Sequence, residues 1–141
     1  MRCQEIMKKD VEYVSVTDTA QVAAKRMRDE NVGFLPVCDQ SKRVLGTITD
    51  RDLTIRVLAD ASPSTTRMED VMTREVVCCR PDDELEAAEK LMGKNQKSRI
   101  VVVDSAGALV GVISLSDIAQ SEEGPKASQT LREVSQREVR H

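Results

Sequence analysis

Aromatic residues are almost absent from this sequence. Of its 141 residues only Tyr13 and Phe34 belong to the set Phe, Tyr and Trp. Proteins that hold several unpaired nucleic-acid bases stack them on aromatic side chains. Extended binding of single-stranded nucleic acid is therefore not expected, and the core must be built from aliphatic residues and methionine.

Long apolar runs are also lacking. No stretch approaches the ~18 apolar residues of a membrane helix, and the charged start MRCQEIMKKD does not resemble a signal peptide. The net charge of −3, from 21 basic and 24 acidic residues, argues against a generally basic surface for DNA or anionic lipid. These features predict a cytoplasmic protein with a small-molecule or protein partner, and neither nucleic acid nor membrane as a partner.

Residues that would mark an enzyme are scarce. The sole histidine is His141, and neither a phosphate-binding loop nor a Gly-x-Gly-x-x-Gly turn is present. The four cysteines show no Cys-x-x-Cys spacing, which favours reduced thiols. We expect no catalytic residue, no metal site and no required cofactor. The alternative is a small enzyme or a redox sensor that uses Cys78 and Cys79.

The sequence contains an internal repeat. GTITDRD at residues 46–52 matches GVISLSD at residues 111–117, and an offset of 65 aligns residues 5–53 with residues 70–118 without a gap. The identical pairs include Met7 and Met72, Val37 and Val102, Gly46 and Gly111, Ile48 and Ile113, and Asp52 and Asp117.

Each copy has the pattern strand, helix, strand, strand, helix. In the first copy the strands are predicted at residues 11–16, 33–39 and 43–49, with a helix capped by Asp18 and a second helix after Thr49. The second copy repeats this order, with Asp83 as the cap. The near-continuous apolar runs predict strands that are covered on both faces.

The predicted fold is mixed α/β (α+β). Two tandem β-α-β-β-α repeats would pack with pseudo-twofold symmetry through their sheets, because one copy alone leaves an apolar face uncovered. The boundaries are repeat 1 at 1–61, a linker at 62–67, repeat 2 at 68–120 and a tail at 121–141. The tail has a weak helical pattern from Leu131, Val134 and Val139.

The repeated hydroxyl-x-x-Asp pattern is the main candidate site. Thr49 with Asp52, and Ser114 with Asp117, each place a hydroxyl and a carboxylate beside the free amides of a helix N-terminus. A phosphate would find donors there, and the carboxylate could accept hydrogen bonds from a ribose diol. The preceding glycine allows close backbone approach. The alternative is that these residues only cap helices.

A basic segment precedes one buried strand. Lys97, Ser98 and Arg99 come just before IVVV, so Arg99 could clamp a phosphate, although a solvated basic edge explains the same pattern. The equivalent residues 32–34 are uncharged, so the two sites should not be equal.

Together these segments resemble a known family, the tandem pair of cystathionine β-synthase (CBS) domains or Bateman module. The resemblance rests on LGTITDRDL and LVGVISLSDI, EIM and DVM, AAKRM and AAEKLM, and FLPVCD and IVVVD, over roughly residues 3–120. It implies two clefts for an adenosine-containing ligand: AMP, ADP, ATP, NAD or S-adenosylmethionine. It also implies a homodimer and a regulatory role toward a protein partner, with the energy state of the cell as one signal.

The resemblance also implies which residues bind the ligand. In one cleft Ser114 and Asp117 hold ribose and phosphate, with the adenine near Val11, Val32, Gly33 and Val112. In the other cleft Thr49 and Asp52 take these parts, surrounded by Thr47, Thr73, Val76, Val77, Lys97, Ser98 and Arg99. Lys8 stands where the second copy has Thr73. A structural dimerisation or scaffold module with vestigial clefts is the alternative function.

Overall fold

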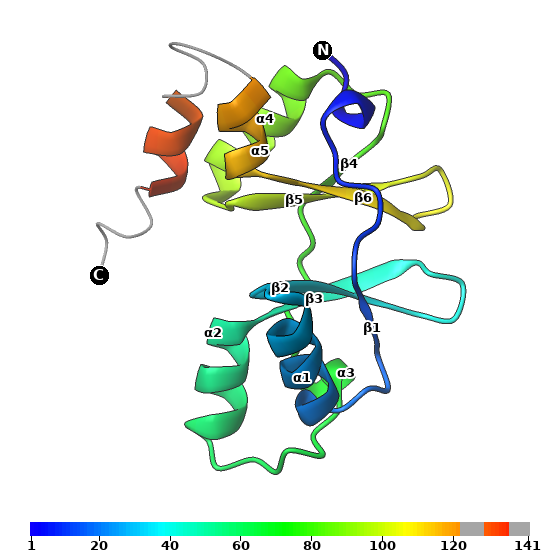
Figure 1. Ribbon diagram of the computed structural model, residues 1–141, viewed down its shortest axis with the longest axis vertical. Helices are drawn as coiled ribbons and strands as arrows, with labels where there is room; N and C mark the ends of the chain where they lie inside the picture. Colours follow the sequence, from blue (N-terminus) through cyan, green and yellow to red (C-terminus); the bar gives the residue numbers. More distant parts are fainter. Residues whose placement is uncertain (122–128, 136–141) are drawn as a thin grey trace. The chain divides into compact units, whose positions relative to one another are not determined.

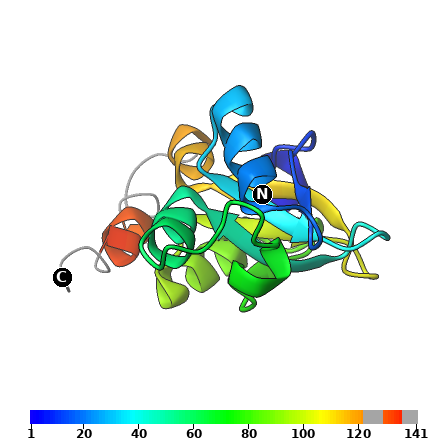
Figure 2. The same ribbon diagram turned by 90° about the horizontal axis from the view of Figure 1, so that it is seen from below.

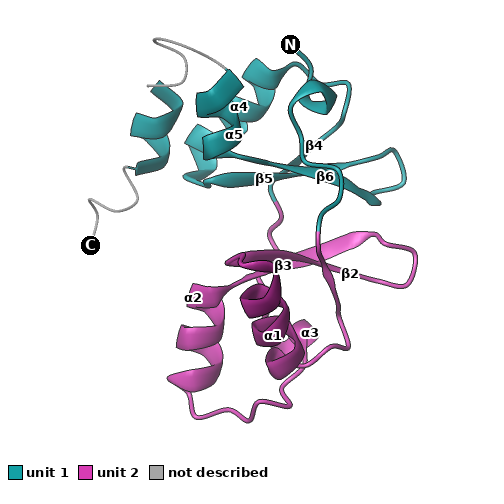
Figure 3. Cartoon of the chain, viewed as in Figure 1, with its two compact units in different colours: residues 1–11, 77–141 teal, residues 12–76 magenta. Residues whose placement is uncertain are grey.

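The chain forms two compact units (Figure 3). The structure, a computed structural model, describes residues 1–121 and 129–135. One unit is Glu12–Val76, and the other joins Met1–Val11 to Val77–His141. The segment that opens the first sequence repeat therefore belongs to the same unit as the second repeat.

The unit of residues 12–76 has one sheet with its helices on one side (Figure 1). Its strands are ordered β1-β2-β3, with β1 parallel to β2 and β2 antiparallel to β3. The elements are β1 (Val14–Ser15), α1 (Ala20–Glu30), β2 (Phe34–Cys38), β3 (Val44–Thr49), α2 (Asp50–Leu53), the π-helix η2 (Thr54–Leu58) and α3 (Met68–Val71).

The unit of residues 1–11 and 77–141 repeats this architecture. Its sheet is ordered β4-β5-β6, again with one parallel and one antiparallel pair. Both antiparallel pairs form hairpins whose strands lie side by side (Figure 1, Figure 2). The elements are η1 (Cys3–Glu5), β4 (Cys78–Cys79), α4 (Leu85–Asn95), β5 (Arg99–Val103), β6 (Leu109–Ser114), α5 (Leu115–Ser121) and a helix at residues 129–135.

The predicted mixed α/β fold with two repeated units is confirmed. Positions 65 residues apart take the same place: Val14 pairs with Val37 in one sheet, and Cys79 pairs with Val102 in the other. Each unit has its own core of aliphatic residues and methionine, as the lack of aromatic residues predicted, and one of the two cores also contains Cys3 and Cys79.

Three local predictions differ from the structure. The predicted strand at 11–16 is reduced to β1. Helix α1 is capped by Thr19, whose Oγ1 accepts from Val22 N, and α4 begins after Glu84. Asp18 and Asp83 instead accept from the backbone N–H of Ser15 (2.8 Å) and Arg80 (2.9 Å) in the preceding turns. Those turns bind the carboxylates that would otherwise cap the helices.

In the tail, Leu131 and Val134 lie in the helix at 129–135, and Val139 lies outside the described residues.

Candidate functional site

The hydroxyl-x-x-Asp pattern forms the same capping box in both units. At the end of β3, Thr49 Oγ1 accepts from Asp52 N, and Asp52 Oδ2 accepts from Thr49 N, both at 3.0 Å. At the end of β6 the corresponding distances for Ser114 and Asp117 are 3.1 and 2.9 Å. The capping interpretation is therefore correct as far as these atoms are concerned.

The box leaves each group with further hydrogen-bonding capacity. A hydroxyl that accepts one hydrogen bond can still donate its hydrogen, and a carboxylate has a second oxygen. Each box therefore offers one donor and one acceptor beside a helix N-terminus. This combination suits a ligand that carries both anionic groups and hydroxyls.

The second carboxylate oxygen differs between the units. Arg56 Nη2 lies 3.6 Å from Asp52 Oδ1, and Arg56 Nη1 donates to Val71 O at 2.8 Å. The position equivalent to Arg56 is Ser121, whose Oγ donates to Ile118 O at 3.2 Å. Within residues 1–121 and 129–135, Asp117 Oδ1 has no such partner. The carboxylate in the second repeat is thus the better acceptor for an added hydroxyl.

A backbone segment crosses the middle of β3 and of β6. Thr73 and Thr47 exchange two backbone hydrogen bonds of 2.9 Å, and Lys8 and Val112 exchange two of 3.0 and 3.1 Å. The close approach that the repeated glycine permits is therefore made by the protein's own backbone. The difference between Lys8 and Thr73 places a long cation at this crossing in one unit and a short hydroxyl in the other.

Three of the remaining predicted site residues, Ser98, Arg99 and Gly33, adjoin these boxes within their own units. Arg99 begins β5 opposite Ser114, and Ser98 O accepts from Leu115 N at 2.8 Å. In the other unit Gly33 O accepts from Asp50 N at 3.0 Å. Lys97, Arg99 and Val32 are exposed, Val112 is buried, and Val11, Gly33, Val76, Val77 and Ser98 are half-buried.

A family model decides the assignment of the chain. The model described as CBS domain matches residues 3–59 and, again, residues 68–124. The chain belongs to the CBS domain family. The resemblance predicted from the repeated segments is thereby confirmed.

Relatives of this CBS pair include both stand-alone proteins and larger enzymes. The CBS domain-containing protein YhcV of Bacillus subtilis is 34% identical over 137 residues, which cover 96% of each chain. YlbB of the same organism is 33% identical over 137 residues, covering 96% of this chain and 92% of its own. The inosine-5′-monophosphate dehydrogenase of Methanocaldococcus jannaschii is 36% identical over 127 residues, which make up 25% of that enzyme.

Solved structures share the fold. Hypoxic Response Protein I, determined with two coordinated zinc ions, has a TM-score of 0.79 and 27% identity, covering 87% of this chain and 100% of its own. The CBS domain pair of MJ0100, in complex with 5′-methylthioadenosine and S-adenosyl-L-methionine, has a TM-score of 0.76 and 26% identity, covering 86% and 94%.

Arg56 is the site residue that the sequence prediction missed. Its signal was available, because an acid and a base four residues apart on a helix form a favourable pair. The contact between Cys3 and Cys79 gave no such signal, because these residues lie 76 positions apart in the sequence.

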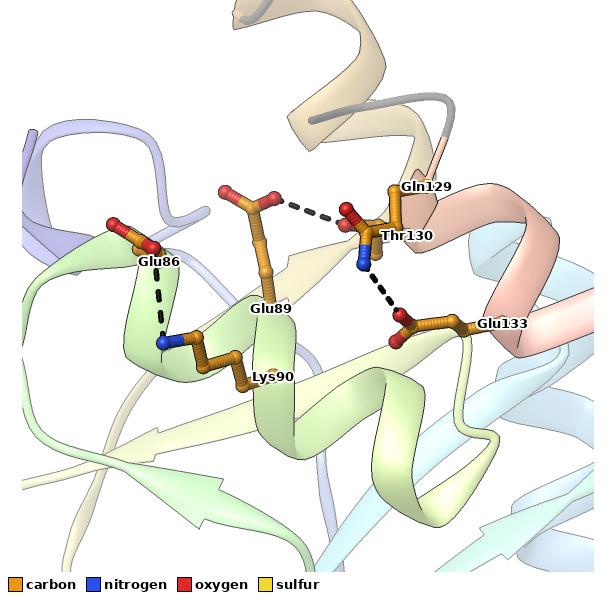
Figure 4. A pocket seen from close by; sticks show the side chains of 6 residues that line it. All are labelled: Glu86, Glu89, Lys90, Gln129, Thr130 and Glu133. Carbon is orange, nitrogen blue, oxygen red and sulfur yellow. Dashed lines mark hydrogen bonds and ion pairs between the residues drawn. The ribbon is translucent and has the colours of Figure 1, made fainter. Parts of the chain in front are cut away.

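A separate pocket lies between α4 and the helix at residues 129–135 (Figure 4). Thr130 Oγ1 donates to Glu89 Oε2 at 2.9 Å, and Gln129 Nε2 donates to Glu133 Oε1 at 3.0 Å. The lining residues are Glu86, Glu89, Lys90, Gln129, Thr130 and Glu133. Three carboxylates make this pocket unsuitable for a phosphate, and it contains none of the predicted site residues.

The described part of the chain contains no group of three or more His, Cys, Asp and Glu side chains arranged to hold a metal ion. No helix among these residues is long and apolar enough to cross a membrane.

Proposed function

We propose that this CBS pair binds an adenosine-containing small molecule and acts as a ligand-responsive regulatory module. The observation that carries the proposal is the Ser114–Asp117 box, in which Asp117 Oδ1 remains able to accept hydrogen bonds. A ribose presents two adjacent hydroxyls to such an oxygen, and hydrogen bonds to a charged acceptor are stronger than neutral ones. The ligands of MJ0100, both adenosine derivatives, support the same chemistry.

The remaining groups have complementary roles in this proposal. The hydroxyls of Ser114 and Thr49 would donate to a phosphate or a sugar oxygen, and Arg99 or Lys97 would attract a phosphate. The apolar side chains of Val11, Val112, Val76 and Val77 would accept an adenine face, together with Val32 and Gly33. Thr47, Thr73 and Ser98 would bind polar atoms of the base and sugar.

Regulation would follow from linkage. A ligand can shift the protein only by as much as its affinity differs between two conformations. We therefore expect the bound state to change a conformation that a protein partner or a second copy in a homodimer distinguishes.

The first prediction concerns Asp117. AMP, ADP, ATP, NAD or S-adenosylmethionine at millimolar concentration should raise the melting temperature of the wild-type protein, because a ligand that binds the folded state stabilises it. Asp117→Asn should raise the Kd of that ligand about 10- to 100-fold, because it removes the charge from the acceptor. Isothermal titration calorimetry measures the Kd, and thermal shift screens the panel.

The capping hydrogen bond of residue 117 to Ser114 N provides the control for stability. An asparagine side chain can still accept from Ser114 N, so D117N should keep the melting temperature of the free protein close to that of the wild type. D52N is the matched variant in the other box. If none of these ligands raised the melting temperature of the wild-type protein, ligand binding would be contradicted. That result would favour the alternative function, a structural dimerisation module. Light scattering would then measure the mass of the protein in solution.

A second prediction concerns Arg56. Its guanidinium holds the carboxylate of Asp52, so the box of residues 49–52 should bind a diol more weakly than the box of residues 114–117. Arg56→Ser introduces the residue found at the equivalent position 121. In calorimetry it should lower the Kd of the weaker site several-fold or add a second binding step. Arg51→Ser, in the adjoining helix α2, is the control for charge. Weaker binding by R56S would show instead that Arg56 contacts the ligand.

A further inference from the structure

Two buried thiols lie in contact in the unit of residues 1–11 and 77–141. Cys3 in η1 and Cys79 in β4 are 0% and 4% exposed, and their sulfur atoms are 3.7 Å apart. The other two cysteines are separate: Cys38 is buried in β2 of the other unit, and Cys78 is exposed.

Packing alone does not require thiols at these positions. With the offset of 65, the equivalents of Cys3 and Cys79 are Met68 and Val14, which belong to the core cluster of the other unit. Methionine and valine thus fill the same places where no sulfur pair is formed. One unit therefore has two thiols in contact, and the other has two hydrophobic core side chains at the equivalent positions.

We propose that Cys3 and Cys79 are a reversible oxidation site, at which hydrogen peroxide closes a disulfide between the N-terminal segment and β4. A disulfide needs its sulfur atoms about 2.05 Å apart, so closure requires a small movement from the present contact. The two residues lie 76 positions apart in the sequence, and the bond would join segments that belong to different sequence repeats. This inference does not depend on ligand binding.

The hydrogen bond between the thiols assigns their roles. Cys79 Sγ donates to Cys3 Sγ. This bond lowers the pKa of the Cys3 thiol, and the same bond, together with burial, raises the pKa of the Cys79 thiol. Thiolate is the reactive form of cysteine, and a thiolate at Cys3 would keep the hydrogen bond from the Cys79 thiol, which gives Cys3 the attacking role and Cys79 the resolving role.

The reaction balances with one peroxide. Cys3 releases its proton and its thiolate attacks one peroxide oxygen, which breaks the O–O bond, forms the Cys3 sulfenic acid and releases hydroxide. Cys79 sulfur then attacks the Cys3 sulfur, the S–O bond breaks, and the Cys79 proton leaves with the departing oxygen as water. In sum, two thiols are oxidised to a disulfide and one hydrogen peroxide is reduced to two waters.

Burial makes the reaction slow and dependent on local opening. The three-residue η1 is held by Cys3 N donating to Asp83 O and Gln4 N donating to Pro81 O, each at 2.9 Å. Peroxide reaches the thiolate when these bonds open, as local fluctuations of small elements permit. Closure would then fix η1 against β4.

The test is carried out on the full chain with Cys78→Ser, because Cys78 and Cys79 are adjacent and peptide mapping does not separate them. After peroxide treatment and removal of excess oxidant, the protein is denatured, its free thiols are alkylated, and intact mass is measured. The C78S protein should lose two hydrogens and two alkylatable thiols as a monomer on a non-reducing gel, and its melting temperature should rise by roughly 5–15 °C. Dithiothreitol should reverse each change.

The matched variants are C78S with C79V and C78S with C3M, which place the residues of the other unit at these sites. Both should fold, and both should keep all their thiols alkylatable after the same peroxide exposure. Loss of two thiols in either variant would overturn the proposal by pointing to Cys38. Absence of a disulfide in C78S, or a stoichiometric zinc ion whose removal by a chelator frees Cys3 and Cys79, would also overturn it.

Discussion

Replacing Gly111 by valine is expected to lower the free energy of unfolding by about 2–4 kcal/mol. A Cβ at this position would lie 2.9 Å from the carbonyl oxygen of Lys8 and 2.7 Å from Met7 Sδ. A methionine tip can move aside, but the Lys8 oxygen belongs to the backbone. The segment must therefore shift, which strains or breaks the two hydrogen bonds between Lys8 and Val112. Urea denaturation followed by circular dichroism measures the loss.

Gly107 provides the control for this prediction. It has a φ of +83°, and a Cβ there would have nothing within 4 Å. Gly107→Ala should therefore cost only the strain of a left-handed residue, about 1–2 kcal/mol. If G111V destabilised the protein less than G107A, the crossing of residues 7–8 over β6 would not be a stabilising contact.

Much of the fold could be predicted because each repeat must bury the same positions. Ile48 and Ile113 are both fully buried, as are Val37 and Val102, another identical pair in the sequence. The boxes of Thr49 with Asp52 and Ser114 with Asp117 were predicted correctly because their spacing is local. The start of α1 was predicted wrongly, because Asp18 and Thr19 are both good caps and the preceding turn binds the carboxylate of Asp18.

Other features have no local signature. The crossing of residues 7–8 over β6 depends on backbone hydrogen bonds between residues about a hundred positions apart, and backbone groups are the same in every residue. The contact of Cys3 with Cys79 likewise joins residues that lie 76 positions apart in the sequence. Sequence repeats show which segments are equivalent, but they do not show whether a segment packs on its own copy or on the other one.

Two core variants should show whether the sequence repeats or the units in space are the cooperative units of unfolding. Ile113→Ala and Ile48→Ala each remove fully buried side-chain atoms and should each destabilise the protein by about 2–5 kcal/mol. Because each isoleucine belongs to a different core cluster, each variant should weaken mainly its own unit. Hydrogen exchange of backbone amides measures this unit by unit.

The informative amides are those of Lys8 and Thr73, which donate to Val112 O and Thr47 O respectively. If the units in space are the cooperative units, I113A should reduce the protection of Lys8 more than that of Thr73, and I48A should do the reverse. If the sequence repeats were the cooperative units, Lys8 would lose protection with I48A instead, because it lies in the first repeat. Equal loss at both amides in both variants would mean that the chain unfolds as a single cooperative unit. Lys8 lies in the first sequence repeat but packs in the unit of the second repeat. Its amide is therefore the one that distinguishes these cases.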